Sequence, residues 1–501
     1  MRERWFNYRP ILLVFAFLLL GSIFAFYLKI NTIATVICAL SVLILVIVLS
    51  VLNKHIKYAL IPIIAFVFGV GGYFLAINSF NKQVNYSPSE IQMRISGIDI
   101  DGTKLKAHGD SCLFDGVKTD DEVSVIIYDN DEKFNNLEIG SIIKVIPAKF
   151  YHSDLFYYGT PNANFYANNT KYTVVADILS VEYIETDKTI AEWVRERVKT
   201  GINFGLTKEN TELVFSALFG DKTSLESDTL ENFKLAGVAH LLAVSGLHVG
   251  IIVAFLTKMF KLMKIKGWWT LLILAPILLF YAYVCGFSIS VLRALIMALI
   301  LQLSKILKRE YDIYNAISIA GIIIFLINPL CAFSASFLLS FSCVFGIAVL
   351  YKPIKSIFSH LPDKIASAIS VSCATSLAMM IIMAYFFNNF NVISIVANII
   401  LIPLFTIAFI CAFVIGMLCV VVQQFGYLLF PLNFLLNFIN FIASFLGHLS
   451  FANLATVRFD YLLIILYIFV LTIIGKLCTI SKKKKVLYSL PIFAVMIFCL
   501  I

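Results

Sequence analysis

Three polar side chains, His240, Ser245 and His248, interrupt an otherwise apolar stretch from Ala236 to Leu256. If the stretch is one helix at about 100° per residue, His248 lies about 80° around from His240 and Ser245 about 140° around. The three then share one polar stripe, and Gly246 removes a side chain where a backbone or a ligand can come close. This pattern predicts a helix face that lines or gates a water-filled path. Interhelical hydrogen bonding that holds a bundle together is the alternative.

The pair Ser245 and His248 also has the residue types of a nucleophile and its base. The two lie one turn apart on the same predicted helix, with no Asp or Glu nearby to orient the imidazole. The surrounding VSGLHVG does not match the sharp GxSxG turn that exposes a catalytic serine. The sequence therefore predicts a non-enzyme without catalytic residues, and an intramembrane Ser/His hydrolase is kept as a rival hypothesis.

Two more polar residues fall inside apolar stretches. Arg293, in SVLRALIMALI, lies about 9 Å below the outer edge of its predicted span, at 1.5 Å per residue. A guanidinium there can bind a phosphate with two parallel hydrogen bonds, or extend to the interface. Asn398 and Pro403 interrupt the long apolar stretch FNVISIVANIILIPL, which predicts a kinked or broken helix facing a cavity. We place Arg293 and Asn398 with the path-lining candidates.

The composition sets the frame for these side chains. Hydrophobic residues make up 60% of the chain and charged residues 14%, and the mean hydropathy is +0.92. A soluble domain is about one quarter charged, so this is a polytopic membrane protein. Residues 81–237 hold 16 Lys and Arg against 25 Asp and Glu, a net charge of −9, and the remainder of the chain carries +18.

Apolar runs predict a polytopic α-helical membrane protein with about 13 spans. The spans are placed at residues 11–28, 33–51, 58–78, 238–260, 268–286, 287–304, 313–328, 333–351, 366–387, 393–422, 426–449, 459–478 and 486–501. The Lys and Arg clusters all fall on one side of this arrangement. By the positive-inside rule the N-terminus is cytoplasmic, and the polar region faces outside.

The outer polar region predicts an inserted small all-β domain. About five short strands, rich in β-branched residues, are separated by turns such as Asp101-Gly102 and Asp115-Gly116. A small OB-like barrel fits this pattern, and a five-stranded sandwich fits it nearly as well. The predicted domains are N-terminal transmembrane helices over 1–80, an extracytoplasmic β domain over 81–187, amphipathic helices at the outer membrane surface over 188–237, and a transmembrane domain over 238–501.

The sequence predicts neither a metal site nor a cofactor. No CxxC, HxH or HExxH spacing occurs, and Cys112 is the only cysteine of the polar region. No GxxxxGK[ST] motif occurs either, so the chain is not expected to drive transport with its own ATP site.

Four blocks of the sequence resemble the ComEC family of bacterial competence proteins. They are LFGDKTSLESDTLENFKLAGVAHLLAVSGLHVG, SVLRALIMALI, NPLCAFSASFLLSFSCVFGI and ISIVANIILIPL. The resemblance implies a channel that passes single-stranded DNA through the cell membrane during natural transformation. It also implies an OB-fold domain and a DNA receptor protein outside, and an ATP-driven DNA motor inside. Membrane lipids are the remaining expected partner, and a homo-oligomer is allowed. A transporter of another polyanionic, lipid-linked or peptide substrate is the alternative function.

Two features depart from that family pattern. Many members continue into a metallo-β-lactamase-like domain, whose HxHxDH-type motif is absent here, so strand degradation is not expected from this polypeptide. The outer region from Pro88 to Thr186 carries 8 basic and 16 acidic residues, whereas single-strand binding needs a positive groove with aromatic platforms. Lys144, Lys149 and Lys171 are the candidate outer DNA or partner contacts if they cluster. The candidate platforms are Tyr128, Phe150, Tyr151, Phe156, Tyr157, Tyr158, Phe165, Tyr166 and Tyr172.

Overall fold

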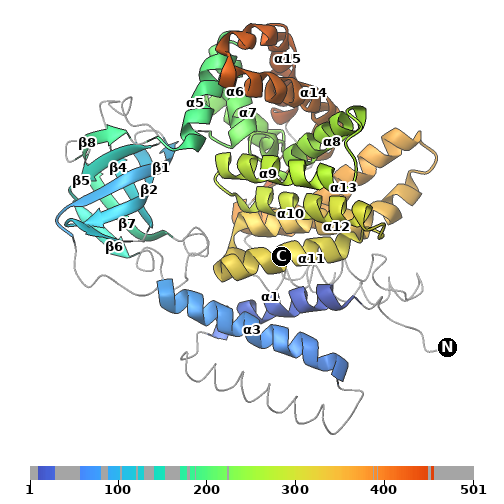
Figure 1. The fold of residues 1–501 in the computed structure, drawn as a ribbon, viewed down its shortest axis with the longest axis horizontal. Helices are drawn as coiled ribbons and strands as arrows, with labels where there is room; N and C mark the ends of the chain where they lie inside the picture. Colours follow the sequence, from blue (N-terminus) through green and yellow to red (C-terminus); the bar gives the residue numbers. More distant parts are fainter. Residues whose placement is uncertain are drawn as a thin grey trace. The chain divides into compact units, whose positions relative to one another are not determined.

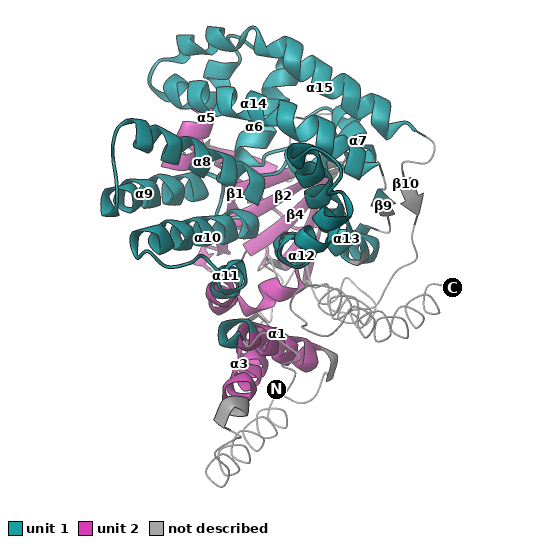
Figure 2. Ribbon diagram, turned by 90° about the vertical axis from the view of Figure 1, so that its right-hand side faces the viewer, with its two compact units in different colours: residues 1–12, 198–321, 335–501 teal, residues 13–197, 322–334 magenta. Residues whose placement is uncertain are grey.

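The computed structural model divides into two compact units, which Figure 2 colours separately. Unit 1 comprises residues 1–12, 198–321 and 335–501, and unit 2 comprises residues 13–197 and 322–334. The structure describes residues 9–28, 57–80, 88–101, 104–119, 122–128, 140–152, 170–177, 181–186, 188–222, 225–387, 389–391, 393–449 and 453–455. The predicted spans at 33–51, 459–478 and 486–501 lie outside these residues.

Unit 2 contains a separate mixed β-sheet domain (Figure 1). Its strands are β1 (Ile91–Asp101), β2 (Lys104–Phe114), β3 (Val117–Lys118), β4 (Glu122–Tyr128), β5 (Ser141–Val145), β6 (Lys149–His152), β7 (Thr170–Asp177) and β8 (Val181–Thr186). They are ordered β6-β7-β4-β2-β1-β5-β8, with β3 beside β2. All pairings are antiparallel except that of β4 with β7.

The strands β5 and β6 follow each other in the sequence but pair with different parts of the sheet. β5 pairs with β1, and β6 pairs with β7. Only Ile146, Pro147 and Ala148 separate β5 from β6, at a place where proline cannot donate a ladder hydrogen bond. Alternate residues of the strands point inward, so that Ile91, Met93 and Ile95 are fully buried in one apolar core.

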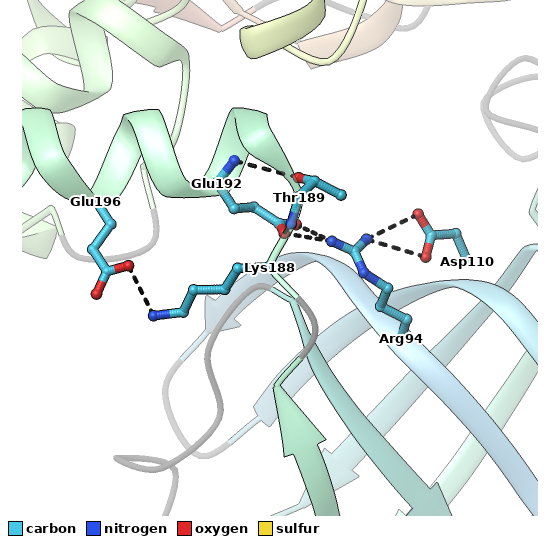
Figure 3. A network of polar contacts seen from close by, with 6 residues as sticks. All are labelled: Arg94, Asp110, Lys188, Thr189, Glu192 and Glu196. Atoms are coloured by element: carbon cyan, nitrogen blue, oxygen red, sulfur yellow. Dashed lines mark hydrogen bonds and ion pairs between the residues drawn. The ribbon is translucent and has the colours of Figure 1, made fainter. Parts of the chain in front are cut away.

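A polar network fixes the helix that follows the sheet (Figure 3). Arg94, on β1, binds the carboxylate of Glu192 on α5 (Ile190–Ile202) and lies 3.5 Å from Asp110. Glu192 also accepts a hydrogen bond from the backbone N–H of Thr189 at 2.8 Å, and the Thr189 hydroxyl accepts one from the Glu192 N–H at 3.3 Å. These reciprocal bonds form a capping box, and Arg94 ties this cap to the sheet.

We expect Arg94→Met to lower the free energy of unfolding of this region by about 2 kcal/mol, because Glu192 then stays buried without its cation. Hydrogen exchange of the full chain in detergent should become faster at the amides of residues 189–196. Lys118→Met, on exposed β3, removes the same charge type and should leave this exchange unchanged. Equal exchange in both variants would show that the network does not stabilise the start of α5.

Two further helices of unit 2, α1 (Pro10–Leu28, from residue 13 on) and α3 (Lys57–Phe80), pack with their backbones in close approach. A Cβ at Gly21 would overlap the carbonyl oxygen of Phe66, and a Cβ at Gly69 would overlap that of Leu18. The Ser22 hydroxyl donates to the Gly69 carbonyl at 3.1 Å. Small residues and a hydroxyl at a helix crossing are typical of membrane helix pairs.

The helices of the remaining chain follow most of the predicted spans. They are α6 (Lys208–Phe219), α7 (Ser227–Leu235), α8 (Gly246–Leu262), α9 (Trp268–Val284), α10 (Ile289–Ile306), α11 (Ile313–Ile327), α12 (Ala335–Ile357), α13 (Asp363–Phe387), α14 (Ser394–Val421) and α15 (Leu432–Gly447). Short 3-10 helices cover Ala239–Leu241, Pro329–Phe333 and Gln423–Leu429, and strands β9 (Asn389–Asn391) and β10 (Asn453–Ala455) pair with each other. Figure 1 shows α9 and α10 side by side.

Three of the described helices, α10, α12 and α14, are long and apolar enough to cross a membrane, or up to four spans if the bent pair Gln423–Leu429 and α15 is one span. The predicted total of about 13 spans thus stays a prediction. α8 starts eight residues later than predicted, α12 ends six residues later and α15 starts six residues later, and the other described spans agree with the predicted boundaries to within three residues.

The short helices of residues 188–237 differ in how far their side chains are buried. α6 is buried along nearly its whole length, from Asn210 to Phe219 except for Glu212. α7 begins after Glu226 without a side-chain cap. In α5, Ile190 and Trp193 are exposed, but Val198 and Ile202 are fully buried. The second half of α5 therefore packs within unit 1.

Candidate functional site

The segment that carries His240, Ser245 and His248 is not one helix. α7 ends at Leu235, and Gly237 takes a φ of +71°, which a side chain would make costly. A 3-10 turn covers Ala239–Leu241, and α8 begins only at Gly246. The predicted polar stripe across all three residues is therefore wrong. His240 lies in the turn and is exposed, whereas Ser245 and His248 lie at the start of α8.

Ser245 and His248 form a capping box at the N-terminus of α8. The Ser245 hydroxyl accepts a hydrogen bond from the Leu247 N–H at 3.3 Å, and the Ser245 backbone N–H donates to His248 Nδ1 at 3.0 Å. These bonds satisfy donors that the first turn of a helix leaves free. Because Nδ1 accepts a hydrogen bond, the proton of a neutral His248 ring is on Nε2.

The His248 ring points into α14. It is fully buried, with its centroid 4.6 Å from that of Phe409 and 5.7 Å from that of Phe405. Within the described part of the chain, His248 Nε2 has no hydrogen-bond partner. A buried N–H donor without an acceptor is costly, so this atom is a candidate contact for a bound ligand or for a polymer that passes through the predicted path.

The cap accounts for the Ser–His spacing without a catalytic role. Ser245 Oγ lies 3.2 Å from His248 Nδ1, but both atoms also take part in the cap. We expect Ser245→Ala to lower the free energy of unfolding by about 1 kcal/mol, and Ser245→Asn, which can cap but cannot act as a nucleophile, to retain stability. Thermal unfolding in detergent measures both variants.

Ser288 provides the matched control, because it occupies the same cap position on α10 but its hydroxyl makes no hydrogen bond among the described residues. Ser288→Ala should therefore leave the unfolding temperature near that of the unmodified chain. Labelling of Ser245 by an active-serine probe in the unmodified chain would instead support the hydrolase hypothesis.

Arg293 lies on α10 with its guanidinium against the start of α8. Its exposed fraction is 5%, and the ring of Phe341 lies 5.9 Å from Cζ. A Cβ at Gly246 would overlap Nη2 of Arg293. Among the described residues no carboxylate pairs with Arg293, and its Nε and Nη1 have no hydrogen-bond partner.

Asn398 lies on α14, 8% exposed, and its Oδ1 has no hydrogen-bond partner in the described chain. α14 continues through Pro403 as one helix of 28 residues, so the prediction of a broken helix is wrong. The structure brings Ser245, Gly246, His248 and Arg293 together at the start of α8. It describes no contact between Asn398 and these four residues.

A known family matches the region that holds this site. The family model described as "Competence protein" matches residues 217–479, more than half of the chain. The chain belongs to the competence protein family.

Individual relatives support the same assignment. "ComE operon protein 3" of Bacillus subtilis is 29% identical over 294 residues, covering 58% of this chain and 37% of that protein. "Recombination protein 2" of Haemophilus influenzae is 26% identical over 147 residues, covering 28% and 19%. The chain thus spans well under two thirds of the length of these relatives. No solved structure matches the chain.

The competence-family match and the apolar helices together identify a membrane protein. His240, Ser245, Gly246, His248, Arg293 and Asn398 all lie inside the matched region, whereas Lys144, Lys149 and Lys171 lie before it.

The candidate lysines of the β domain are spread over three strands, β5, β6 and β7. Lys144 pairs with Glu90 at 2.8 Å, and this hydrogen bond raises the pKa of Lys144. Lys149 is exposed and lies opposite Val175, four residues from Lys171 along β7.

Two of the predicted aromatic platforms belong to the core of the β domain. Tyr172 is 1% exposed and stacks on Phe150 with centroids 5.0 Å apart, and both rings pack against Phe114. Tyr172 holds the domain together and does not present a face to a base, so the platform prediction is wrong for it, whereas Phe150 is partly buried against this core.

One polar cluster of this competence-family protein was not predicted from the sequence. Asn210, on α6, is fully buried and donates to the amide oxygens of Asn433 and Asn437 on α15, each at 2.9 Å. Asn433 also donates to the Gly205 carbonyl at 2.8 Å. The spacing of Asn433 and Asn437, one turn apart in an apolar helix, is the signal that marks such an interhelical bond.

Proposed function

We propose that this chain is a channel that passes single-stranded DNA across the bacterial cytoplasmic membrane during natural transformation. The proposal is supported by the competence-family match over 217–479 and by the similarity to "ComE operon protein 3". A channel needs no covalent step of its own, which agrees with the use of Ser245 and His248 as a helix cap.

The observation that carries the proposal is the buried Arg293 beside the start of α8. A buried cation without a carboxylate costs stability, and a cation beside the positive end of a helix dipole costs more. A phosphate placed there would offset both costs, that of the unpaired cation and that of its position at the helix N-terminus, because guanidinium groups and helix N-termini each bind phosphate. The arrangement fits a polyanion that passes or docks.

A DNA strand carries one charge per nucleotide, and its transfer across apolar surface costs far more than one contact returns. A working path must therefore be wet, with Arg293 and the Nε2–H of His248 among the few donors along it. We expect a wide aqueous path that these groups gate. His240, Ser245, Gly246 and Asn398 stay candidate path residues.

We propose that the β domain is OB-like and extracytoplasmic. β5 and β6 can be counted as one strand that is interrupted at Pro147, which gives five main strands: β1, β2, β4, β5–β6 and β7. Because β5 pairs with β1 and β6 pairs with β7, this strand brings the sheet back on itself, as in a barrel. Its excess of acidic residues favours a docking or gating role for an extracytoplasmic DNA receptor protein over direct strand binding.

The proposed orientation places the N-terminus in the cytoplasm and the β domain outside, because the Lys and Arg clusters fall on one side. Cysteine labelling in intact cells should modify a cysteine introduced at Asp131 and spare one at Lys483. The reverse pattern would overturn both the orientation and the direction of transport, and with it the placement of a cytoplasmic ATP-driven motor.

A clean deletion tests the function itself. We expect labelled donor DNA to bind the deletion strain but to stay sensitive to added DNase, and transformants to fall to background. Complementation with the full chain should restore both. Normal transformation by the deletion strain would contradict the proposed function.

A further inference from the structure

A basic cavity lies at the ends of α8 and α10 opposite to Gly246 and Ser288, where these helices begin. Its volume is about 440 Å³, within the range of pockets that hold small ligands. Four lysines line it: Lys258 and Lys261 from α8, Lys266 from the α8–α9 turn and Lys305 from α10. No Asp or Glu lines this cavity.

A buried amide adds a second, independent observation. Gln302, one turn before Lys305, is 5% exposed and lines the same cavity. Among the described residues its side chain has no hydrogen-bond partner. Its amide is not among the enclosed polar atoms that lack a partner, so the amide group opens onto the cavity and can exchange hydrogen bonds with a ligand there. Lysines alone could serve only to balance the C-terminal dipoles of α8 and α10, but such a role does not need the amide.

The surroundings of the cavity are those of a membrane interface. Trp268 and Trp269 at the start of α9 are 55% and 68% exposed, and Leu262 and Met263 at the end of α8 are 76% and 62% exposed. Exposed tryptophans gather at the level of lipid head groups. Apolar side chains that remain uncovered beside a basic cavity fit acyl chains next to a phosphate, and they do not fit a free polyanion.

We propose that this cavity binds the phosphodiester head group of one anionic phospholipid in the leaflet next to the lysine clusters. The lysines donate to the phosphate oxygens, Gln302 donates to a phosphate or glycerol oxygen, and the chains lie beside Trp268 and Trp269. The site is separate from the proposed DNA path and does not depend on it.

Native mass spectrometry of the purified full chain in neutral detergent, titrated with phosphatidylglycerol, tests the proposal. We expect one phosphatidylglycerol to bind at least about tenfold more tightly than phosphatidylcholine. Lys258→Gln, Lys261→Gln and Lys305→Gln together should weaken phosphatidylglycerol binding at least about tenfold and leave phosphatidylcholine binding unchanged. Gln302→Leu, which retains every charge, should weaken it several-fold.

Lys264, Lys308 and Lys352 provide the matched control, because they are exposed and do not line the cavity. Their joint change to Gln removes the same charge and should leave the affinity within about twofold. If this control lost as much affinity for phosphatidylglycerol, the overall positive charge of the protein would explain the effect, and the proposed site would be wrong. Displacement of the lipid by inorganic phosphate would show a free-anion site, and displacement by a single-stranded oligonucleotide would show a nucleic-acid site; either result contradicts the proposal. Because the readout is lipid binding, it is independent of DNA uptake.

Discussion

Arg293→Gln is expected to reduce transformation at least about tenfold while the protein stays in the membrane at normal abundance. The variant would lose the proposed phosphate contact, and a contact of about 1.4 kcal/mol corresponds to a factor of ten. It should not unfold the helices, because Arg293 is 5% exposed and no carboxylate among the described residues depends on it. Removing a buried charge without a partner is neutral or stabilising.

The control for this variant is Arg309→Gln, an identical change at an exposed position just after α10. It should transform normally. Arg293→Lys keeps the charge but loses the planar pair of donors, so an intermediate loss is expected. Normal transformation by Arg293→Gln at normal abundance would show that this arginine only packs between helices.

Gly246→Ala should reproduce the loss of transformation without touching Arg293 itself. The added methyl group would overlap Nη2 of Arg293, which is the far end of a flexible side chain. The guanidinium can therefore move aside, so that the fold survives while the phosphate contact is misplaced. We expect at least about a tenfold drop in transformation, with an unfolding temperature no lower than that of the unmodified chain, because alanine is the better helix former.

Gly250→Ala is the matched control, one turn further along α8, where an added Cβ meets nothing within 4 Å. It should transform normally. A double variant, Gly246→Ala with Arg293→Gln, should lose no more than Arg293→Gln alone, because both changes act on one contact. Additive losses would mean that Gly246 serves another purpose, such as close approach of a strand to the α8 backbone.

The sequence predicted most helices because a membrane span is a long, continuous run of apolar residues. Apolar runs gave the positions of α9 to α14 to within a few residues, and β-branched segments gave a separate β domain. The start of α8 was missed because an apolar run does not distinguish a helix from a capped turn. The Ser245–His248 box begins α8, whereas the predicted stripe places both residues inside a continuous helix.

Contacts across the bundle could not be derived from one sequence. The approach of Arg293 to Gly246 joins residues 47 apart, and that of Asn210 to Asn433 joins residues 223 apart. Tyr172 illustrates the opposite error, because an aromatic ring in a strand faces either the core or the solvent, and here it faces the core.

Photo-crosslinking during DNA uptake tests most directly whether the strand passes the start of α8. A crosslinking residue replaces Leu247, beside Gly246, in cells that are taking up labelled DNA, and a second strain carries it at Phe434, which is 82% exposed on α15. We predict a DNA–protein adduct at position 247 that requires single-stranded DNA in transit, and none at position 434. Efficient uptake without an adduct at 247, or equal adducts at both positions, would contradict a DNA path beside Arg293.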